Sequence, residues 1–197
     1  MDKASDNPLN LGDITTEEHI TRLLQNDPWR MKVLHAAASL SLPDWWIGAG
    51  FLRNIVWDAI EGNVPSPTRD VDLVYFDRND TAPETDWAYD EQMKAKFPFA
   101  DWEIRNQARM HYVNNFAPYT STKDGIAHWV ETATCVAVRI DAGKLRYLFC
   151  YGTEDLFGLI ARPVSCFRTP ELLPTFYERI EKKRWREKWP HLQVVDF

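Results

Sequence analysis

The chain has 197 residues and a mass of 23.0 kDa, a length typical of one domain or of one domain with a small appendage. Lys and Arg number 23 and Asp and Glu number 29, so the formal net charge at pH 7 is −6. The 45% hydrophobic content and the nine tryptophans exclude a disordered chain. The acidic balance argues against a general nucleic-acid coat protein, because Lys and Arg dominate binding to phosphate backbones. Any phosphate chemistry must therefore be local and helped by a cation.

No targeting or membrane segment is evident in the sequence. The N-terminus, MDKASDNPLN, lacks the apolar stretch of a signal peptide, and no run approaches the ~20 apolar residues of a membrane span. The three cysteines are widely spaced and the five histidines are scattered, which predicts free thiols and argues against a zinc site. We therefore expect a cytoplasmic protein that makes no contact with a membrane.

The N-terminal third is predicted to be mainly helical. Residues 1–12 are polar and predict a flexible arm, and residues 13–197 are expected to form a single domain. Thr15 and Glu18 have the spacing of a capping box, and Pro28 suits the first turn of a second helix. Helices are thus predicted over 13–26, 28–42 and 51–62, with one short apolar strand over 45–47.

The rest of the chain alternates strands with helices. Asp141-Ala142-Gly143 separates two β-rich runs and predicts a hairpin. The predicted strands are 70–76, 102–105, 135–140 and 144–149. The predicted helices are 86–97, 106–114, 124–131, 154–160 and 170–189. This order predicts an α/β (α+β) fold, in which a mixed, partly antiparallel sheet of about five strands is flanked by helices.

Two acidic residues, Asp70 and Asp72, begin the strand predicted over 70–76. Residues i and i+2 of a strand lie on one face, roughly 6.6 Å apart, whereas Val71 and Leu73 point the opposite way, toward the core. Neighbouring carboxylates raise each other's pKa unless a cation or a donor compensates, and Mg²⁺ prefers such oxygens. Taken alone, the pair also fits a solvated strand end.

The turn Gly48-Ala49-Gly50 lies between a predicted strand and a predicted helix. At such a turn, backbone N–H groups and the positive end of the helix dipole accommodate phosphate oxygens. By themselves, Gly48 and Gly50 equally fit a tight turn with positive φ. Together with the carboxylate pair on the neighbouring strand, they predict a phosphate cradle beside a metal site.

The segment W-I-G-A-G-F-L-R-N, followed by a loop and D-V-D-L-V-Y-F-D, resembles the signature of the nucleotidyltransferase superfamily, the polymerase-beta-like group. It is similar to the head domain of bacterial CCA-adding enzymes, whose turn reads Gly-Gly-x-x-Arg-Asp; Asn54 stands here in place of the Asp. The likeness is closer still to small bacterial nucleotidyltransferase-like proteins, from about Trp29 to Val195. The loop before Asp70 is longer than in CCA-adding enzymes, and 197 residues leave little room for their further domains.

The resemblance implies a nucleotidyltransferase fold and a reaction class. An acceptor oxygen would attack the α-phosphate of a nucleoside triphosphate (NTP), with two Mg²⁺ (or Mn²⁺) ions stabilising the attacking and leaving oxygens. Asp70 and Asp72 would hold the ions. Glu103 is the best candidate for a third carboxylate that serves as metal ligand or base, and Asp101 and Asp77 are the alternatives.

The same resemblance implies a set of nucleotide-binding residues, namely Gly48, Gly50, Arg53, Asn54 and Arg109. Arg53 falls one turn into the helix after the glycine turn and offers a forked donor to a triphosphate. The alternative is a surface arginine paired with Asp58 or Glu61. Arg109 would hold phosphate or base, unless its segment is a packed helix in which it forms a salt bridge.

The acceptor expected from these observations is a small molecule or a protein. One alternative is a nucleotide-binding module that no longer catalyses, and another is a protein that binds tRNA ends through the basic residues of 170–189. The net charge of −6 disfavours a nucleic-acid partner, although tRNA stays open. Trp185 and Trp189 recur at near-helical spacing and are expected in the core rather than on an RNA-binding surface.

Overall fold

The computed structural model describes residues 14–65 and 69–196, so the arm predicted over 1–12 lies outside the described residues. The helices are α1 (Glu17–Gln25), α2 (Pro28–Ala38), α3 (Gly50–Ile60), α4 (Pro83–Lys96), α5 (Gln107–Met110), α6 (Thr122–Ala127), α7 (Glu154–Phe157), α8 (Leu173–Lys182) and α9 (Trp185–Lys188). The strands are β1 (Trp46–Gly48), β2 (Asp70–Tyr75), β3 (Asp101–Asn106), β4 (Val136–Asp141), β5 (Lys144–Phe149), β6 (Ile160–Ala161) and β7 (Gln193–Val194). Short 3₁₀ turns are η1 (His111–Asn114), η2 (Thr132–Thr134) and η3 (Ser165–Phe167).

A five-stranded sheet in the order β3-β2-β1-β4-β5 forms the centre of the molecule. β2 and β3 run parallel, β1 is antiparallel to both of its neighbours, and β4 and β5 form the predicted hairpin. The mixed, partly antiparallel sheet expected from the sequence is therefore confirmed. A second sheet, in which β6 and β7 pair in parallel, was not predicted.

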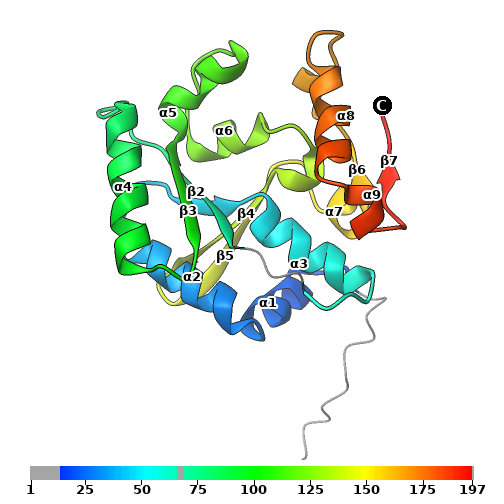
Figure 1. The fold of residues 1–197 in the computed structure, drawn as a ribbon, viewed down its shortest axis with the longest axis horizontal. Helices are drawn as coiled ribbons and strands as arrows, with labels where there is room; N and C mark the ends of the chain where they lie inside the picture. Colours follow the sequence, from blue (N-terminus) through cyan, green and yellow to red (C-terminus); the bar gives the residue numbers. More distant parts are fainter. Residues whose placement is uncertain (1–13, 66–68, 197) are drawn as a thin grey trace, which may run out of the picture.

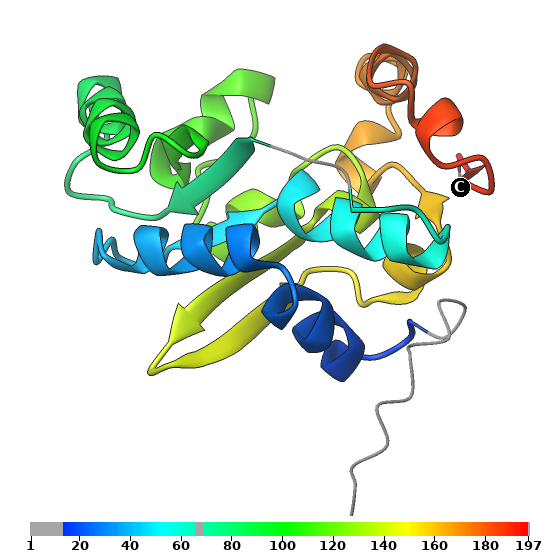
Figure 2. The same ribbon diagram turned by 60° about the horizontal axis from the view of Figure 1, so that its bottom comes forward.

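Two hydrophobic cores lie on the two sides of this sheet. The larger core contains Val71 and Leu73 of β2, both fully buried as predicted, and the helices α1, α2 and α3 that run together along one side (Figures 1 and 2). The smaller core joins Val74 of β2 to side chains of α6 and η3. Because successive side chains of a strand alternate, Asp70 and Asp72 point to the side of the smaller core, where α5, α6 and α8 stand.

The outer edge of β3 is covered by carboxylates from α4. Asp90 accepts a hydrogen bond from the backbone N–H of Ile104 at 2.7 Å, and Asp86 accepts from the backbone N–H of Asn106 at 3.1 Å. An uncovered edge strand would present unpaired N–H groups, so these two bonds hold β3 in place beside β2. The strand that carries Glu103 is thereby fixed on both of its edges.

Several predicted boundaries differ from the structure by a few residues. Thr16, not Thr15, caps α1 by accepting from the backbone N–H of His19. The second helix ends at Ala38, before the apolar segment that leads into β1, and α4 begins three residues early because Pro83 suits its first turn. The helix predicted over 124–131 is displaced to Thr122–Ala127, where the Ser121 side chain caps it.

The long helix predicted over 170–189 is wrong: the segment forms two helices. The break falls at Arg184, which adopts a left-handed conformation with φ 52° between α8 and α9. The turn brings Trp185 and Trp189 edge-on against Trp57 of α3, with ring centroids 5.5 Å and 4.9 Å away. A straight helix would carry the two rings past Trp57, so burial of this tryptophan cluster sets the bend.

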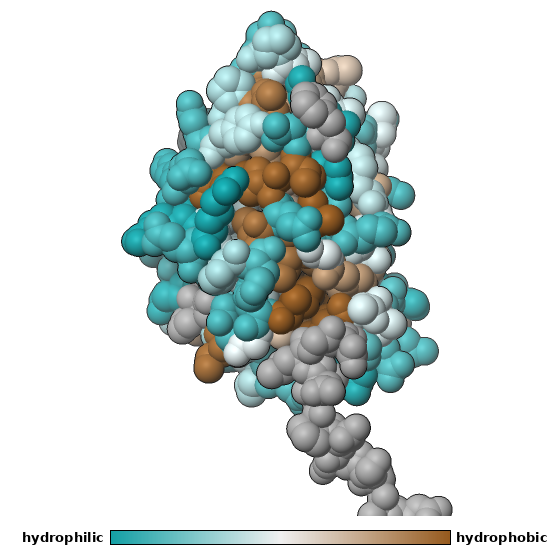
Figure 3. Space-filling model, turned by 90° about the vertical axis from the view of Figure 1, so that its right-hand side faces the viewer, coloured by the Kyte–Doolittle hydropathy of each residue, from teal (hydrophilic) through white to brown (hydrophobic). Residues whose placement is uncertain are grey.

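Figure 3 shows the side of the molecule that faces right in Figure 1, where apolar surface lies between hydrophilic side chains. Trp185 of α9 and Trp189, which follows this helix, are both buried, as predicted. Within 14–65 and 69–196, no helix combines the length and the apolar character needed to cross a bilayer.

The three cysteines are free thiols, as predicted.

Candidate active site

The acidic residues singled out from the sequence meet on two parallel strands. Asp72 of β2 pairs directly with Glu103 of β3, and Asp70 pairs with Asp101. Directly paired residues of neighbouring strands share a face, so all four carboxylates project to the side that carries the smaller core. The structure therefore brings Asp70, Asp72 and Glu103 together at the start of β2.

The two alternatives to Glu103 are placed differently. Asp101 forms an ion pair with Arg69, at 3.2 Å, at the exposed end of the strands. Asp77 follows the opposite end of β2, where its side chain accepts from the backbone N–H of Asn79 at 2.8 Å. Of the three, Glu103 is the carboxylate in register with Asp72.

Asp72 lies in an environment that disfavours its charge. Burial raises the pKa of its carboxyl, and the neighbouring carboxylate of Glu103 raises it further, whereas Arg179 and Arg53 act in the opposite direction. Glu103 is more open, with 60% of its side chain exposed, and lies 3.5 Å from Arg105. A cation at this point would relieve the repulsion within the pair.

These carboxylates fit a hard divalent cation by the chemistry of their donors. Mg²⁺ takes carboxylate oxygens and retains waters that phosphate oxygens replace. As the side chains stand, no three Asp, Glu, His or Cys residues within the described ranges already form a metal-binding group. The donor set is suitable, and holding an ion would need side-chain rotation of the exposed Asp70 and Glu103.

The turn before α3 combines a tight packing contact with an unusual backbone. A Cβ on Gly48 would lie 2.5 Å from the ring of Trp129, so this glycine makes room for an aromatic side chain. Ala49 adopts φ 54° and ψ −128°, a conformation that glycine favours and alanine rarely takes. Gly50 then begins α3, whose first N–H groups have no partner within the helix.

Arg53 is the most enclosed cation of the site. It is 5% exposed, donates to Thr134 Oγ1 at 2.7 Å and to Asn54 Oδ1 at 2.8 Å, and lies 4.1 Å from the ring of Trp185. Burial lowers the pKa of its guanidinium to about 10, and its Nε is buried without a hydrogen-bond partner. The alternative of a surface arginine is therefore wrong. Asn54, expected at the phosphate, accepts one of these hydrogen bonds and so orients Arg53.

A cavity of about 160 Å³ opens in front of this guanidinium, and we call it the cationic cavity. The N-terminal turn of α3 supplies Gly50, Arg53 and Asn54 to its wall. Basic side chains of the C-terminal helices complete it, namely Arg179, Lys183 and Lys188. Asp70 and Asp72 lie at its edge. Four cationic groups and a helix N-terminus around one space favour a polyanion.

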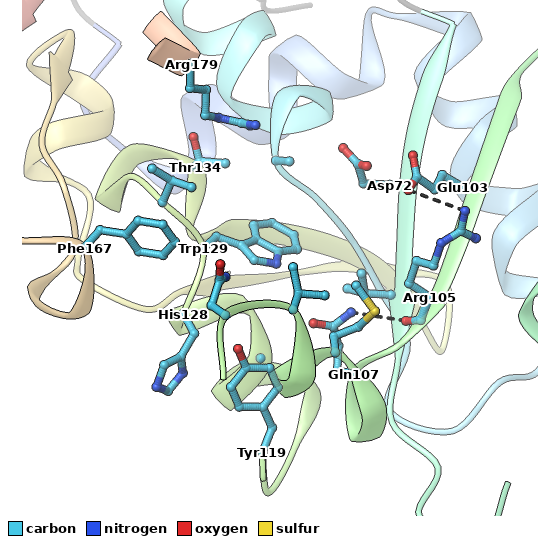
Figure 4. A pocket seen from close by; sticks show the side chains of 17 residues that line it. Asp72, Glu103, Arg105, Gln107, Tyr119, His128, Trp129, Thr134, Phe167 and Arg179 are labelled. Atoms are coloured by element: carbon cyan, nitrogen blue, oxygen red, sulfur yellow. Dashed lines mark hydrogen bonds and ion pairs between the residues drawn. The ribbon is translucent and has the colours of Figure 1, made fainter. Parts of the chain in front are cut away.

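A second cavity, of about 260 Å³, lies over the face of β2 and β3, and we call it the aromatic cavity (Figure 4). Its walls include Tyr119, His128, Trp129 and Phe167. Charged residues also line it: Asp72, Glu103 and Arg105 project from the strands, and Arg179 reaches in from α8. The residues common to both cavities are Ala49, Asp72 and Arg179.

Arg179 was missed by sequence reasoning, which treated it only as one charge of a basic helix. Its Nε lies 2.9 Å from Oε1 of Glu131, a carboxylate with no exposed surface. Among the described residues, neither Glu131 oxygen has a hydrogen-bond partner, so attraction between the charges holds the pair. The two residues are 48 positions apart, and neither belongs to a motif that would have linked them.

Arg109 is not brought to either cavity. It lies on α5, where its guanidinium forms an ion pair with the buried Asp86, with Nε at 3.0 Å. The neighbouring Arg105 does line the aromatic cavity, and it is held by Asp90 at 2.8 Å. The salt-bridge alternative for Arg109 describes its position in the structure.

Acidic residues on adjacent strands, a glycine turn that opens a helix and basic side chains around the helix N-terminus fit a nucleotidyltransferase. Residues 35–194 match the model of a nucleotidyltransferase family, and the chain belongs to that family. No curated protein gives a match to the chain.

Solved structures agree with this assignment. An NMR structure described as revealing a CCA-adding enzyme head domain is 27% identical, with 95% of this chain and 100% of that chain covered, at a TM-score of 0.85. A CCA-adding enzyme in complex with CTP is 14% identical over 89% of this chain, at a TM-score of 0.56. The Thermotoga maritima CCA-adding enzyme complexed with tRNA is 15% identical over 89% of this chain, at a TM-score of 0.55. The chain spans 43% and 42% of those two enzymes, so they show a shared fold.

Proposed function

We propose that this protein transfers a nucleoside monophosphate from an NTP to an acceptor hydroxyl, carried by a small molecule or a protein, with the help of a divalent cation. One observation carries the proposal. Asp72, a half-buried carboxylate with a raised pKa, stands in register with Glu103 at the junction of a cationic cavity and an aromatic cavity. That junction offers separate places for a triphosphate and for the molecule that attacks it.

Asp70, Asp72 and Glu103 would hold the cation, Mg²⁺ or Mn²⁺. When bound, such an ion neutralises charge on phosphate oxygens and stabilises the attacking and leaving oxygens. The chain's own part is to present the carboxylates from two strands whose register is fixed by backbone pairing. A bound cation would also offset the charge of Asp72, which burial and then the neighbouring carboxylate of Glu103 disfavour.

The cationic cavity would receive the triphosphate. Arg53 is held by Thr134 and Asn54, so its orientation is fixed before any ligand arrives. Arg179 reaches the same space and is held from behind by Glu131. Fixed donors of this kind stabilise the charge of a leaving pyrophosphate without having to reorganise.

Glu103 would accept the proton of the acceptor hydroxyl. It stands on the side of Asp72 that faces the aromatic cavity, and it does not line the cationic cavity. Most of its side chain is exposed, so it can rotate toward a bound acceptor. Arg105 forms an ion pair with this carboxylate, at 3.5 Å.

The test is transfer of label from α-³²P-labelled ATP, CTP, GTP and UTP, with and without Mg²⁺, into candidate acceptors. We expect labelled product with the parent protein and its loss in Asp70→Asn/Asp72→Asn. A thermal-shift measurement on the same samples separates the inactive nucleotide-binding module, which would be stabilised by NTP and metal without transferring label. Absence of any metal-dependent stabilisation by any NTP would count against both.

A tRNA end is a second candidate acceptor, favoured by one observation. Lys183 lines the cationic cavity and belongs to an exposed basic run with Lys182 and Arg184, next to the proposed triphosphate site. A relative of the same fold is described in complex with tRNA. If tRNA is the acceptor, its retention should fall with salt and should be lost when the three basic residues are neutralised.

A further inference from the structure

The aromatic cavity is the feature of this molecule whose chemistry points to a particular ligand. Resting on the function proposed above, we infer that it binds the acceptor, and that the acceptor is an uncharged, flat small molecule with a hydroxyl group on or beside an aromatic ring. The inference is built from the position of the cavity, from its lining and from its size.

Position assigns the cavity to the acceptor rather than to the triphosphate. In an in-line displacement the attacking oxygen and the leaving pyrophosphate lie on opposite sides of the reacting phosphorus. The cationic cavity, with its four basic side chains, is the place for the pyrophosphate. The attacking molecule must then come from the other side of Asp72, where Glu103 lines both the aromatic cavity and an acidic groove.

The lining indicates a flat and uncharged ligand. Tyr119 and His128 lie with ring centroids 4.8 Å apart, and Trp129 and Phe167 line the same space. Aromatic faces of this kind bind another planar ring by stacking or by edge contacts. The charged side chains project from the strands and from α8 rather than from the segments that carry the rings, and two of them, Glu103 and Arg105, are already paired (Figure 4).

The polar groups among these rings are few and fixed. Gln107 is buried, and its amide nitrogen donates to the carbonyl of Arg105 at 3.2 Å, which leaves its amide oxygen facing the cavity (Figure 4). Gly125 of α6 leaves room for this side chain, since a Cβ there would lie 2.6 Å from the amide oxygen. A ligand would thus meet a fixed acceptor among aromatic walls, as in other small-molecule sites.

The size of the cavity suits one ring with short substituents. A volume of about 260 Å³ corresponds to roughly nine waters at their share of liquid volume, and it lies just below the range of drug-sized sites. A substituted phenol or benzyl alcohol fits this space. An acidic groove also reaches Asp72 and Glu103, and its further lining by Asp70, Asp90 and Asp101 would instead attract a cationic acceptor.

The transfer step balances with these parts. The acceptor oxygen forms an ester bond to the α-phosphorus, and the bond from that phosphorus to the oxygen bridging it to the β-phosphorus breaks. Pyrophosphate leaves with the bonding electron pair. The hydroxyl proton passes to the carboxylate of Glu103, which releases it to solvent.

The test uses the full chain and a matched set of probes: 4-ethylphenol, its cationic analogue tyramine and its anionic analogue 4-hydroxyphenylpropionate. Binding is followed by calorimetry, and transfer by labelling from α-³²P-NTP. Val113→Trp narrows the cavity from a position that is 68% exposed. Its control is Tyr112→Trp, at the neighbouring residue, which is 76% exposed and does not line the cavity.

We expect 4-ethylphenol to bind at least tenfold more tightly than either charged analogue and to become labelled. Val113→Trp should weaken its binding at least tenfold, whereas Tyr112→Trp should not, and both variants should keep the metal-dependent stabilisation by NTP. The inference is overturned if NTP and metal stabilise the protein but 4-ethylphenol does not bind. Preference for tyramine, equal losses in the two variants, or labelling of a tyrosine-containing peptide but not of the free phenol would also overturn it. Phenol binding without any NTP binding would instead remove the proposed function.

Discussion

The cationic cavity and the aromatic cavity share Ala49, Asp72 and Arg179, but the rest of their walls consists of different kinds of side chain. The first is walled by the start of α3 and by α8 and α9, which supply guanidinium and ammonium groups. The second is walled by the strands, α5, η1 and α6, which supply rings and an amide. A molecule with one polyanionic substrate and one flat, uncharged substrate would need this division, with a carboxylate pair between the two halves.

The largest effect is expected at Asp72, the carboxylate common to both cavities. Asp72→Asn should lower the rate of label transfer by roughly 10³-fold or more, because the variant loses the charge that would hold the cation. Asp101→Asn is the matched control, since Asp101 pairs with Arg69 away from the junction. Equal rates in the two variants would contradict a special place for Asp72.

The same substitution should stabilise the fold. The pKa of Asp72 is raised, chiefly by burial, so the folded protein holds this proton more tightly than the unfolded chain. The resulting destabilisation is absent below the ordinary pKa of 3.8 and grows as pH rises through the raised value. Without metal, Asp72→Asn should therefore have a higher Tm than the parent at pH 7, and the difference should narrow as pH falls. A lower Tm at pH 7 would be the opposite result.

Substitution of Arg53 should affect ligand binding in the cationic cavity but not in the aromatic cavity. Arg53→Met keeps a stem against the tryptophan rings but removes the cation, and should weaken NTP binding roughly 10–100-fold while 4-ethylphenol binding stays unchanged. Calorimetric titrations with each ligand measure both. Arg186→Met, at an exposed position of α9 outside both cavities, is the control. Parallel losses for the two ligands would show that the cavities do not act separately.

The ion pair between Arg179 and Glu131 should contribute measurably to the free energy of unfolding. Arg179→Met leaves Glu131 buried and without its partner, which should cost on the order of 3 kcal/mol in the free energy of unfolding by urea. Adding Glu131→Gln should recover part of this loss, because the remaining group is then uncharged. A double variant no more stable than Arg179→Met would indicate that the two side chains do not interact.

The smallest effect concerns the strained residue between the cavities. Ala49→Gly should raise the free energy of unfolding by about 1 kcal/mol, because glycine takes the positive φ of this position without steric cost. Ala59→Gly, inside α3, is the control and should lower it by about 1 kcal/mol. Both values come from urea unfolding. A loss of stability in both variants would show that the backbone at Ala49 carries no strain.

Local patterns in the sequence were sufficient for the acidic half of the site and for the sheet. The alternation Asp70-Val71-Asp72-Leu73 fixes which side chains face the core, and Trp102-Glu103-Ile104 does the same for the neighbouring strand. The hairpin turn at Asp141-Ala142-Gly143 needed only its own residues. Such elements are predictable because the contacts that form them are close in sequence.

The other half depends on contacts between distant segments. Arg179 is placed by Glu131, and Trp129 by the absence of a side chain at Gly48. The left-handed Arg184 that ends α8 has no turn signal of its own, and follows from burial of two tryptophans against Trp57. A single sequence carries no periodicity that reports such pairings, so the basic and aromatic walls became visible only in three dimensions.

The central claim is that Asp72 joins an NTP and a divalent cation at the junction of the two cavities. Calorimetric titration of the full chain with NTP, in the presence and absence of Mn²⁺, tests it most directly when the parent is compared with Asp72→Asn and Asp101→Asn. The account predicts metal-enhanced binding in the parent and in Asp101→Asn, and loss of the enhancement in Asp72→Asn. The same enhancement in all three proteins, or in none, would contradict it.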